Sequence, residues 1–175
     1  MSLFLLLIAC SGKTADTSTE PSSPDSPPED TSPQLPGPPD AFTLNISGEA
    51  TLSLNFDTPT CTIPDGAPNF YAFWRLASGE HKFVLKAELR NIYDGEGSYT
   101  EADGTVIKLQ EEAGGEARFF QTKQDDGDTA TVSIEGIADD LIWGSGNAPS
   151  LHSGTGSISL EPASFPIWCT EENTN

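Results

Sequence analysis

The chain has 175 residues with 27 acidic and 8 basic side chains, which give a formal net charge of −19 at pH 7. Nucleic acids and anionic lipid headgroups both require clustered Lys and Arg, so this composition argues against both as partners. The acidity serves solubility or attracts cations and basic partners, and charge by itself identifies no ligand.

A short apolar run, Leu3 to Ala9, ends directly on Cys10. The run has the length of a signal-peptide core and is far shorter than the roughly 20 residues that a membrane-spanning helix needs. The four residues LIAC, which end on Cys10, resemble the lipobox of bacterial lipoproteins. The resemblance implies that residues 1–9 are a cleaved signal peptide, that Cys10 carries a thioether-linked lipid, and that the new amino terminus is acylated, for example with palmitate. The alternative is a buried apolar strand that ends in an ordinary cysteine.

The lipoprotein resemblance also implies a location. A lipid on Cys10 attaches a protein to a membrane of the cell envelope, and Ser11 in place of Asp after the cysteine implies the outer membrane if the host is Gram-negative. We therefore expect a lipid-anchored envelope protein whose partner is an unidentified envelope or surface protein.

Residues 10–40 combine this anchor with a segment rich in Pro, Ser and Thr. Eight of residues 21–40 are proline, and Leu35 is the one large apolar residue of residues 11–40. Proline fixes φ and lacks a backbone donor, so the segment is expected to be a disordered, extended tether. At about 3.1 Å per residue, it could hold a domain up to roughly 90 Å from the membrane.

Residues 41–170 change in character, with β-branched and aromatic residues in short alternating runs between Gly, Asp and Pro. This pattern predicts an all-β domain, and the number of short strands favours an antiparallel two-sheet β-sandwich. Residues 171–175 are expected to form a disordered tail.

Apolar residues occupy even positions on both sides of Gly48, over residues 42–46 and 50–56. A two-residue turn at Gly48 and Glu49 would place apolar side chains opposite polar ones. We therefore expect one long strand that bends or bulges at the glycine.

A hairpin with one buried face is predicted from Phe70 to Ala87. A four-residue loop, residues 77–80, would pair Phe70 with Ala87 and Trp74 with Phe83, so that apolar side chains face each other.

Further strands are expected around two turn sequences and at the end of the domain. Residues 101–104, which end in Asp-Gly, and residues 123–128 are each predicted to be hairpin loops. Residues 137–143 break the alternation and predict a short helical turn or an irregular crossover. The sequences GTGSISL and SFPIWC predict the last two strands.

Once Cys10 is assigned to the anchor, Cys61 and Cys169 remain as an even pair in an exported chain. A disulfide between them is the expected state, and two free thiols are the alternative. The loop between them spans about 108 residues, for which the chain-entropy model gives roughly 4 to 5 kcal/mol of stabilisation.

A second resemblance rests on the arrangement of the domain. The pattern of a long opening strand, a cysteine shortly after it, the segment YDGEGSYT and the closing pair Trp168 and Cys169 resembles small exported β-sandwich lipoproteins, including the mycobacterial lipoprotein-antigen type. This resemblance implies a sandwich pinned by the bond from Cys61 to Cys169, and it brings no catalytic residues.

No catalytic motif is present, and we expect no enzyme. His81 and His152 are the two histidines, and the sequence contains no nucleophile elbow, phosphate loop, dinucleotide fingerprint or zinc-binding helix motif. A triad of His152, Ser153 and an aspartate at 139 or 140 has poor geometry, because adjacent side chains on a strand point to opposite faces.

Two binding sites are alternatives to a purely structural role. Carboxylates for a Ca²⁺ ion are offered by turn segments, with the candidates Asp94, Glu96, Glu101, Asp103, Asp125, Asp126 and Asp128. An aromatic platform for a glycan is offered by Trp143 with Tyr93 or Tyr99. The sequence therefore predicts a non-catalytic interaction or structural domain, without a cofactor, and a carbohydrate- or Ca²⁺-binding module as the alternative.

Overall fold

The computed structural model of the protein describes residues 35–65, 67–123 and 127–170. The predicted signal peptide, the anchor at Cys10 and the predicted tail lie outside these residues, as does the linker up to residue 34. Within them, no helix is long and apolar enough to cross a membrane.

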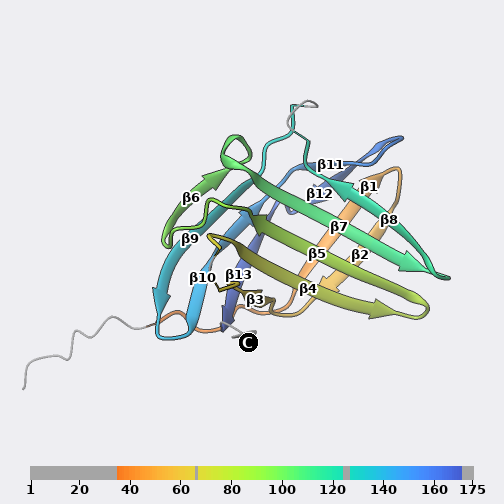
Figure 1. Cartoon of the computed structure of the whole chain (residues 1–175). Coiled ribbons are helices and arrows are strands. Elements are labelled where there is room, and N and C mark those ends of the chain that lie inside the picture. The colour runs from red at the N-terminus through yellow and green to blue at the C-terminus, as the bar shows by residue number, and fades with distance from the viewer. Residues whose placement is uncertain (1–34, 66, 124–126, 171–175) are drawn as a thin grey trace, which may run out of the picture. The chain divides into compact units, whose positions relative to one another are not determined.

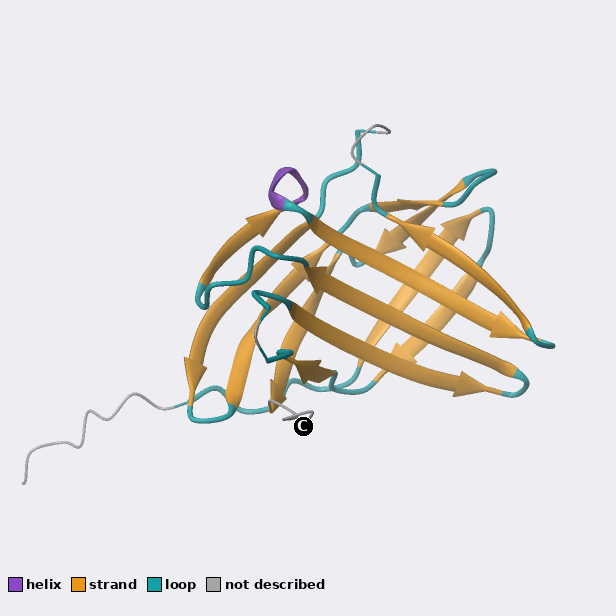
Figure 2. Cartoon of the chain, viewed as in Figure 1, coloured by secondary structure: helices purple, strands orange, loops and turns teal. Residues whose placement is uncertain are grey.

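Thirteen described strands form two antiparallel sheets, which confirms the predicted all-β, two-sheet fold (Figures 1 and 2). In spatial order, the nine-stranded sheet holds β2 (Leu52–Phe56), β1 (Phe42–Gly48), β12 (Ser157–Glu161), β11 (Ser150–His152), β8 (Glu116–Gln121), β7 (Thr105–Ala113), β5 (His81–Leu89), β4 (Phe70–Ser78) and β3 (Thr60–Thr62). The four-stranded sheet holds β13 (Ser164–Thr170), β10 (Leu141–Asn147), β9 (Thr131–Ala138) and β6 (Gly97–Thr100). A 3₁₀ turn, η1 (Glu101–Asp103), follows β6.

The core lies between the two sheets and is built by the alternation that the sequence shows. Trp74 of β4 is fully buried, and its ring meets that of Phe165 of β13 edge-on at 5.1 Å between centroids. Val132 and Ile134 of β9 are buried as their parity predicts. Apolar side chains of both sheets therefore share one interior.

The predicted disulfide is present and joins the two sheets at their edges. Cys61 of β3 and Cys169 of β13 lie 5.7 Å apart between Cα atoms, are bonded, and are buried. The alternative of two free thiols is wrong.

Residues 42–56 form a hairpin, so the prediction of one bent strand was wrong. β1 pairs with β2, and Phe42 lies opposite Phe56 while Ile46 lies opposite Leu52. The chain reverses around Glu49, and an odd number of residues separates each pair of facing positions. Even-numbered apolar residues of the two strands therefore face each other, which a two-residue turn at Gly48 and Glu49 would have prevented. Glycine is required at position 48 for this reversal. Its φ of 111° is rarely adopted by other residues, and a Cβ atom there would lie 2.6 Å from the Ser157 carbonyl oxygen, which is too close.

The hairpin of β4 and β5 is confirmed, but its predicted register was wrong by two residues. Trp74 lies opposite Leu85, and Phe70 lies opposite Leu89. The turn is the two-residue pair Gly79 and Glu80, which is shorter than the predicted loop. A shift of two residues leaves every side chain on its predicted face, so the buried face was predicted correctly.

Two predicted hairpins are crossovers between the sheets. β6 pairs with β9 rather than with β7, and η1 carries the chain from one sheet to the other. Likewise β8 pairs with β7 and β11, and the segment after it leads to β9 in the opposite sheet. Asp and Gly favour any sharp reversal of the chain, so the same turn residues fit a hairpin and a crossover.

Residues 137–143, predicted as a helical turn or irregular crossover, instead complete the hairpin of β9 and β10. The turn is formed by Asp139 and Asp140, and Asp139 adopts a φ of 52°. The register shifts by one residue between Trp143 and Gly144. This bulge is the reason that the sequence alternation breaks there.

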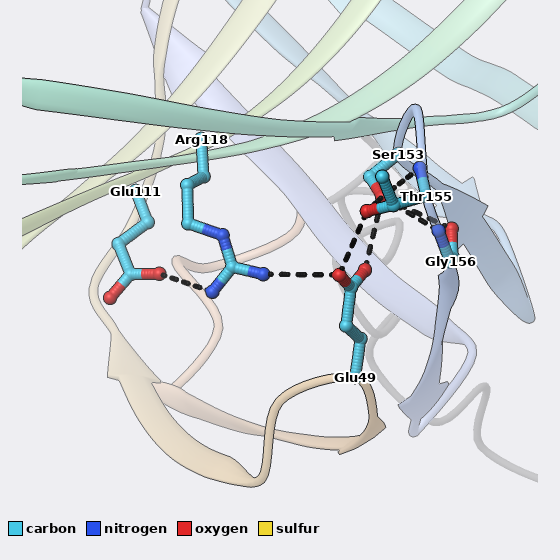
Figure 3. A network of polar contacts seen from close by, with 6 residues as sticks. All are labelled: Glu49, Glu111, Arg118, Ser153, Thr155 and Gly156. Carbon is cyan, nitrogen blue, oxygen red and sulfur yellow. Dashed lines mark hydrogen bonds and ion pairs between the residues drawn. The ribbon is translucent and has the colours of Figure 1, made fainter.

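A chain of polar contacts connects the loop between β1 and β2 with the loop between β11 and β12 and with strands β8 and β7 of the same sheet (Figure 3). Glu49 accepts hydrogen bonds from Ser153 Oγ at 3.0 Å and Thr155 Oγ1 at 3.1 Å. The guanidinium of Arg118 forms ion pairs with two carboxylates: Nη2 lies 3.5 Å from Glu49 Oε1, and Nη1 lies 3.9 Å from Glu111 Oε2. These contacts hold the curled end of the nine-stranded sheet together.

Candidate functional site

The outer face of the nine-stranded sheet collects most of the basic residues of the domain. Strands β4, β5, β7 and β8 lie side by side there (Figure 1), and their registers place one set of side chains on the face away from the core. We call this the basic face, and its charged members, including Arg90 just after β5, are Arg75, Lys82, Lys86, Glu88, Arg90, Lys108 and Glu112.

The charge of the basic face is opposite to that of the rest of the domain. Residues 41–175 contain 21 acids and 7 bases, and the basic face holds two of those acids and five of those bases. The face therefore carries a formal charge of +3, and the other residues of this segment carry −17.

A buried carboxylate lies at the centre of the basic face. The side chain of Glu88 is 2% exposed and forms an ion pair with Lys86 at 2.7 Å, one with Lys108 at 3.3 Å, and a third with Arg90. Burial raises the pKa of Glu88, but the hydrogen bond from Lys86 and the surrounding positive charges lower it more, so this pKa lies below its ordinary value. One negative charge against three positive charges leaves the cluster with a charge of +2.

A hollow of ≈ 370 Å³ opens over this cluster. Its polar lining adds the amides of Gln110 and Gln121 to the charged groups, and its apolar lining includes Phe73, Val84 and Phe119. Phe119 is 54% exposed, an unusual state for a phenylalanine. The hollow thus combines positive charge, amide groups and exposed apolar surface.

Aromatic rings hold the basic side chains in place. Lys86 Nζ lies 4.6 Å from the ring centroid of Tyr71 and 4.8 Å from that of Phe73. The guanidinium of Arg75 lies 4.8 Å from the same Phe73 ring. Cation–π contacts restrict the motion of long side chains, so the charges are preorganised on the face.

The predicted calcium ligands are engaged within the protein where the structure describes them. Asp94 accepts a hydrogen bond from Tyr99 at 2.7 Å, and Glu96 accepts one from the Ile137 backbone at 3.1 Å. Asp125 and Asp126 lie outside the described residues. Over residues 35–65, 67–123 and 127–170, no group of three or more His, Cys, Asp or Glu side chains is arranged to hold a metal ion. Calcium binding stays a prediction.

Asp128, another calcium candidate, connects the backbone at Lys123 with strand β11. Its carboxylate accepts hydrogen bonds from Ser150 Oγ at 2.6 Å and from the Lys123 backbone at 3.0 Å, and it lies 3.0 Å from His152 Nε2. Burial, and next the charge of Asp128, raise the pKa of Glu101, another candidate. Asp103 instead accepts bonds from both the hydroxyl and the backbone of Thr100, which lower its pKa and cap η1.

The structure separates the aromatic residues that were predicted as a platform. Tyr99 is 7% exposed and lies on the inner face of its sheet. The ring centroid of Tyr93 lies 6.2 Å from that of Tyr99 and 5.3 Å from that of Phe70. Trp143 lies on the outer face of β10, where its ring covers Gly136 so closely that a Cβ there would be 2.0 Å from it. Trp143 and Tyr99 therefore belong to opposite faces of one sheet.

Neither histidine meets a nucleophile in the geometry of a triad. His81 Nδ1 lies 2.9 Å from Glu111, and His152 lies beside Asp128, while Ser153 Oγ donates to Glu49. The aspartates at 139 and 140 form the turn between β9 and β10. The basic face was not predicted, because the net charge of the chain does not reveal where its few bases lie. The alternation of Lys82, Lys86 and Glu88 with apolar residues on β5 was the available signal.

Comparisons with protein-family models, with curated proteins and with solved structures found no match for this chain.

Proposed function

We propose that the chain is a lipid-tethered, non-catalytic binding protein of the bacterial cell envelope, and that its basic face binds an acidic partner. The anchor part of the proposal rests on the lipobox resemblance that ends at Cys10. The binding part rests on the basic face, which offers charge, hydrogen-bond donors and apolar surface in one place.

The separation of charge is the observation that carries the binding proposal. Like charges that share a face repel each other and lower the stability of the fold. Bases distributed among the many acids of this domain would avoid that repulsion. Here five of seven bases lie together. A positive face on an otherwise negative domain attracts and orients an acidic partner.

Binding fits the central carboxylate better than catalysis does. A general acid or base needs a pKa near the working pH, whereas the cations around Glu88 lower its pKa and keep it ionised. Glu88 therefore acts as an internal counter-ion that orients Lys86 and Lys108 toward the hollow.

The anchor is tested by Cys10→Ser. This substitution removes the thiol that takes the lipid, so we expect the protein to move from the membrane fraction to the soluble fraction. Mass spectrometry of the mature wild type should find an acylated Cys10 at the amino terminus. Thr14→Ser, a change of similar size in the linker, should stay in the membrane fraction. An intact, unmodified Met1 in protein from the native host would contradict the proposal.

The basic face is tested by retention on a sulfonated cation-exchange resin at pH 7. A chain with a charge of −19 is expected to flow through such a resin, but the basic face should retain it at low ionic strength. Arg75→Glu with Lys82→Glu changes the face from +3 to −1 and should abolish retention. Lys13→Glu with Lys123→Glu makes the same change in total charge elsewhere and should leave the protein retained. Flow-through of the wild type, or equal loss in both variants, would show that the face does not act as a unit.

A further inference from the structure

We infer that the acidic partner is a polysaccharide with carboxylate-bearing sugar rings, bound across β8, β7, β5 and β4 in the hollow over Glu88. This inference rests on the proposed function and specifies the ligand of the same site. The hollow is open and lies on a sheet face, a shape suited to an extended chain.

Seven residues that line the hollow, with Arg75 next to Val84 at its edge, form two adjacent rows that run across the strands. The first row reads Phe119, Gln110, Val84 and Arg75, and the second reads Gln121, Lys108, Lys86 and Phe73. Neighbouring strands are about 4.8 Å apart, so each row spans about 14 Å. That length accommodates a run of sugar rings rather than a single small anion.

The two rows together offer the groups that an acidic sugar chain requires. Lys86 and Lys108 would pair with carboxylates, and Glu88 neutralises just one of the three cations around it. The planar amides of Gln110 and Gln121 both donate and accept, as ring hydroxyls require. The exposed ring of Phe119 offers an apolar surface to the C–H face of a sugar ring.

The charge distribution favours a single polymer chain over an anionic bilayer. A bilayer is a wide negative plane, and the domain that would approach it carries −14 over residues 41–175. A polymer within the hollow lies inside a Debye length, about 8 Å at physiological ionic strength, of the cationic cluster, while the distant acids are screened. Local attraction then outweighs the repulsion by the rest of the domain.

The test uses the full chain with Cys10→Ser, oligomers of galacturonic acid, and their methyl esters as neutral controls. Calorimetry should detect binding of the acid and none of the ester, and binding should weaken as salt rises. In NMR spectra, the side-chain amides of Gln110 and Gln121 should shift on binding. Lys108→Gln should weaken binding about tenfold, as expected for loss of a charge-assisted hydrogen bond.

Two further variants separate binding from folding. Phe119→Ala alters an exposed residue outside the Glu88 cluster and should also weaken binding, with an unchanged melting temperature. Lys123→Gln removes one charge outside the basic face, where Lys123 Nζ donates to the Ser153 carbonyl oxygen at 2.9 Å, and it should change affinity less than threefold.

The outcomes distinguish this inference from the proposed function. One outcome is that the protein binds polyglutamate, polyphosphate or phosphatidylglycerol vesicles but not oligogalacturonate. That result would contradict the inference that the partner is a polysaccharide, and it would support the proposal that the partner is acidic. Equal binding of acid and methyl ester would overturn the role of the carboxylate. Failure of every acidic probe would overturn both the polysaccharide and the acidic partner, while the lipid anchor is tested separately by Cys10→Ser.

Discussion

Removal of the disulfide between Cys61 and Cys169 is expected to lower the free energy of unfolding by about 2 to 5 kcal/mol. The bond closes a loop with a sequence separation of 108, so its loss returns much conformational entropy to the unfolded chain. A typical domain is stable by about 5 to 15 kcal/mol, so the loss is a large fraction of the total. Urea unfolding of Cys61→Ala with Cys169→Ala measures it.

The position of the bond predicts where the loosening begins. β3 has three residues, and it contacts β13 across the sheet edges without a described backbone ladder between them. Hydrogen exchange should therefore rise first in β3 and β13. The reduced wild type serves as the matched control and should have the same stability as the double variant. A loss below about 1 kcal/mol would show that the sheets hold these edges without the bond.

Glu88→Gln is expected to lower the free energy of unfolding by roughly 2 kcal/mol or more. Loss of one member of a buried ion pair commonly costs 3 to 5 kcal/mol, but Lys86 and Lys108 are about a quarter exposed, so water offsets part of the cost. The variant leaves three cations close together around a neutral amide. Urea unfolding at pH 7 measures the effect.

The same variant has a defined pH dependence. Glu88 has a lower pKa in the folded protein than its ordinary value of 4.5, so the unfolded chain binds this proton first as the pH falls. The stabilisation from Glu88 is therefore complete above pH 4.5 and is lost as the pH falls through the folded-state pKa. The difference between wild type and Glu88→Gln should be constant near neutral pH and should shrink in acid.

Glu112→Gln is the matched control for Glu88→Gln. Glu112 lies on the same basic face, but its side chain is 46% exposed and 3.9 Å from Lys82. Its replacement should change stability by less than about 0.5 kcal/mol, without the acid-dependent difference. Equal effects of the two variants would show that the cations around Glu88 are solvated well enough to need no counter-ion.

The alternation of apolar and polar residues by itself determined which side of each strand is buried. Leu44, Ile46, Val132 and Ile134 lie in the core as their parity predicted, and this held even where the register was two residues off. Parity is a local property of the extended backbone, so it can be read without a partner strand. The pairing of Cys61 with Cys169 was likewise predictable from the count of cysteines.

Apart from the hairpin of β4 and β5, only the tertiary structure decided which strands are neighbours. The turn residues between β6 and β7 fit a hairpin, yet β6 pairs with β9, because burial between two sheets rewards a crossover that local turn chemistry does not encode. The candidate site depends on the same choice. Parity places Lys86 and Lys108 on the outer face of their own strands, but the pairing of β5 with β7 brings both beside Glu88. Contacts between strands depend on partner and register, and these are set by the packing of the whole domain.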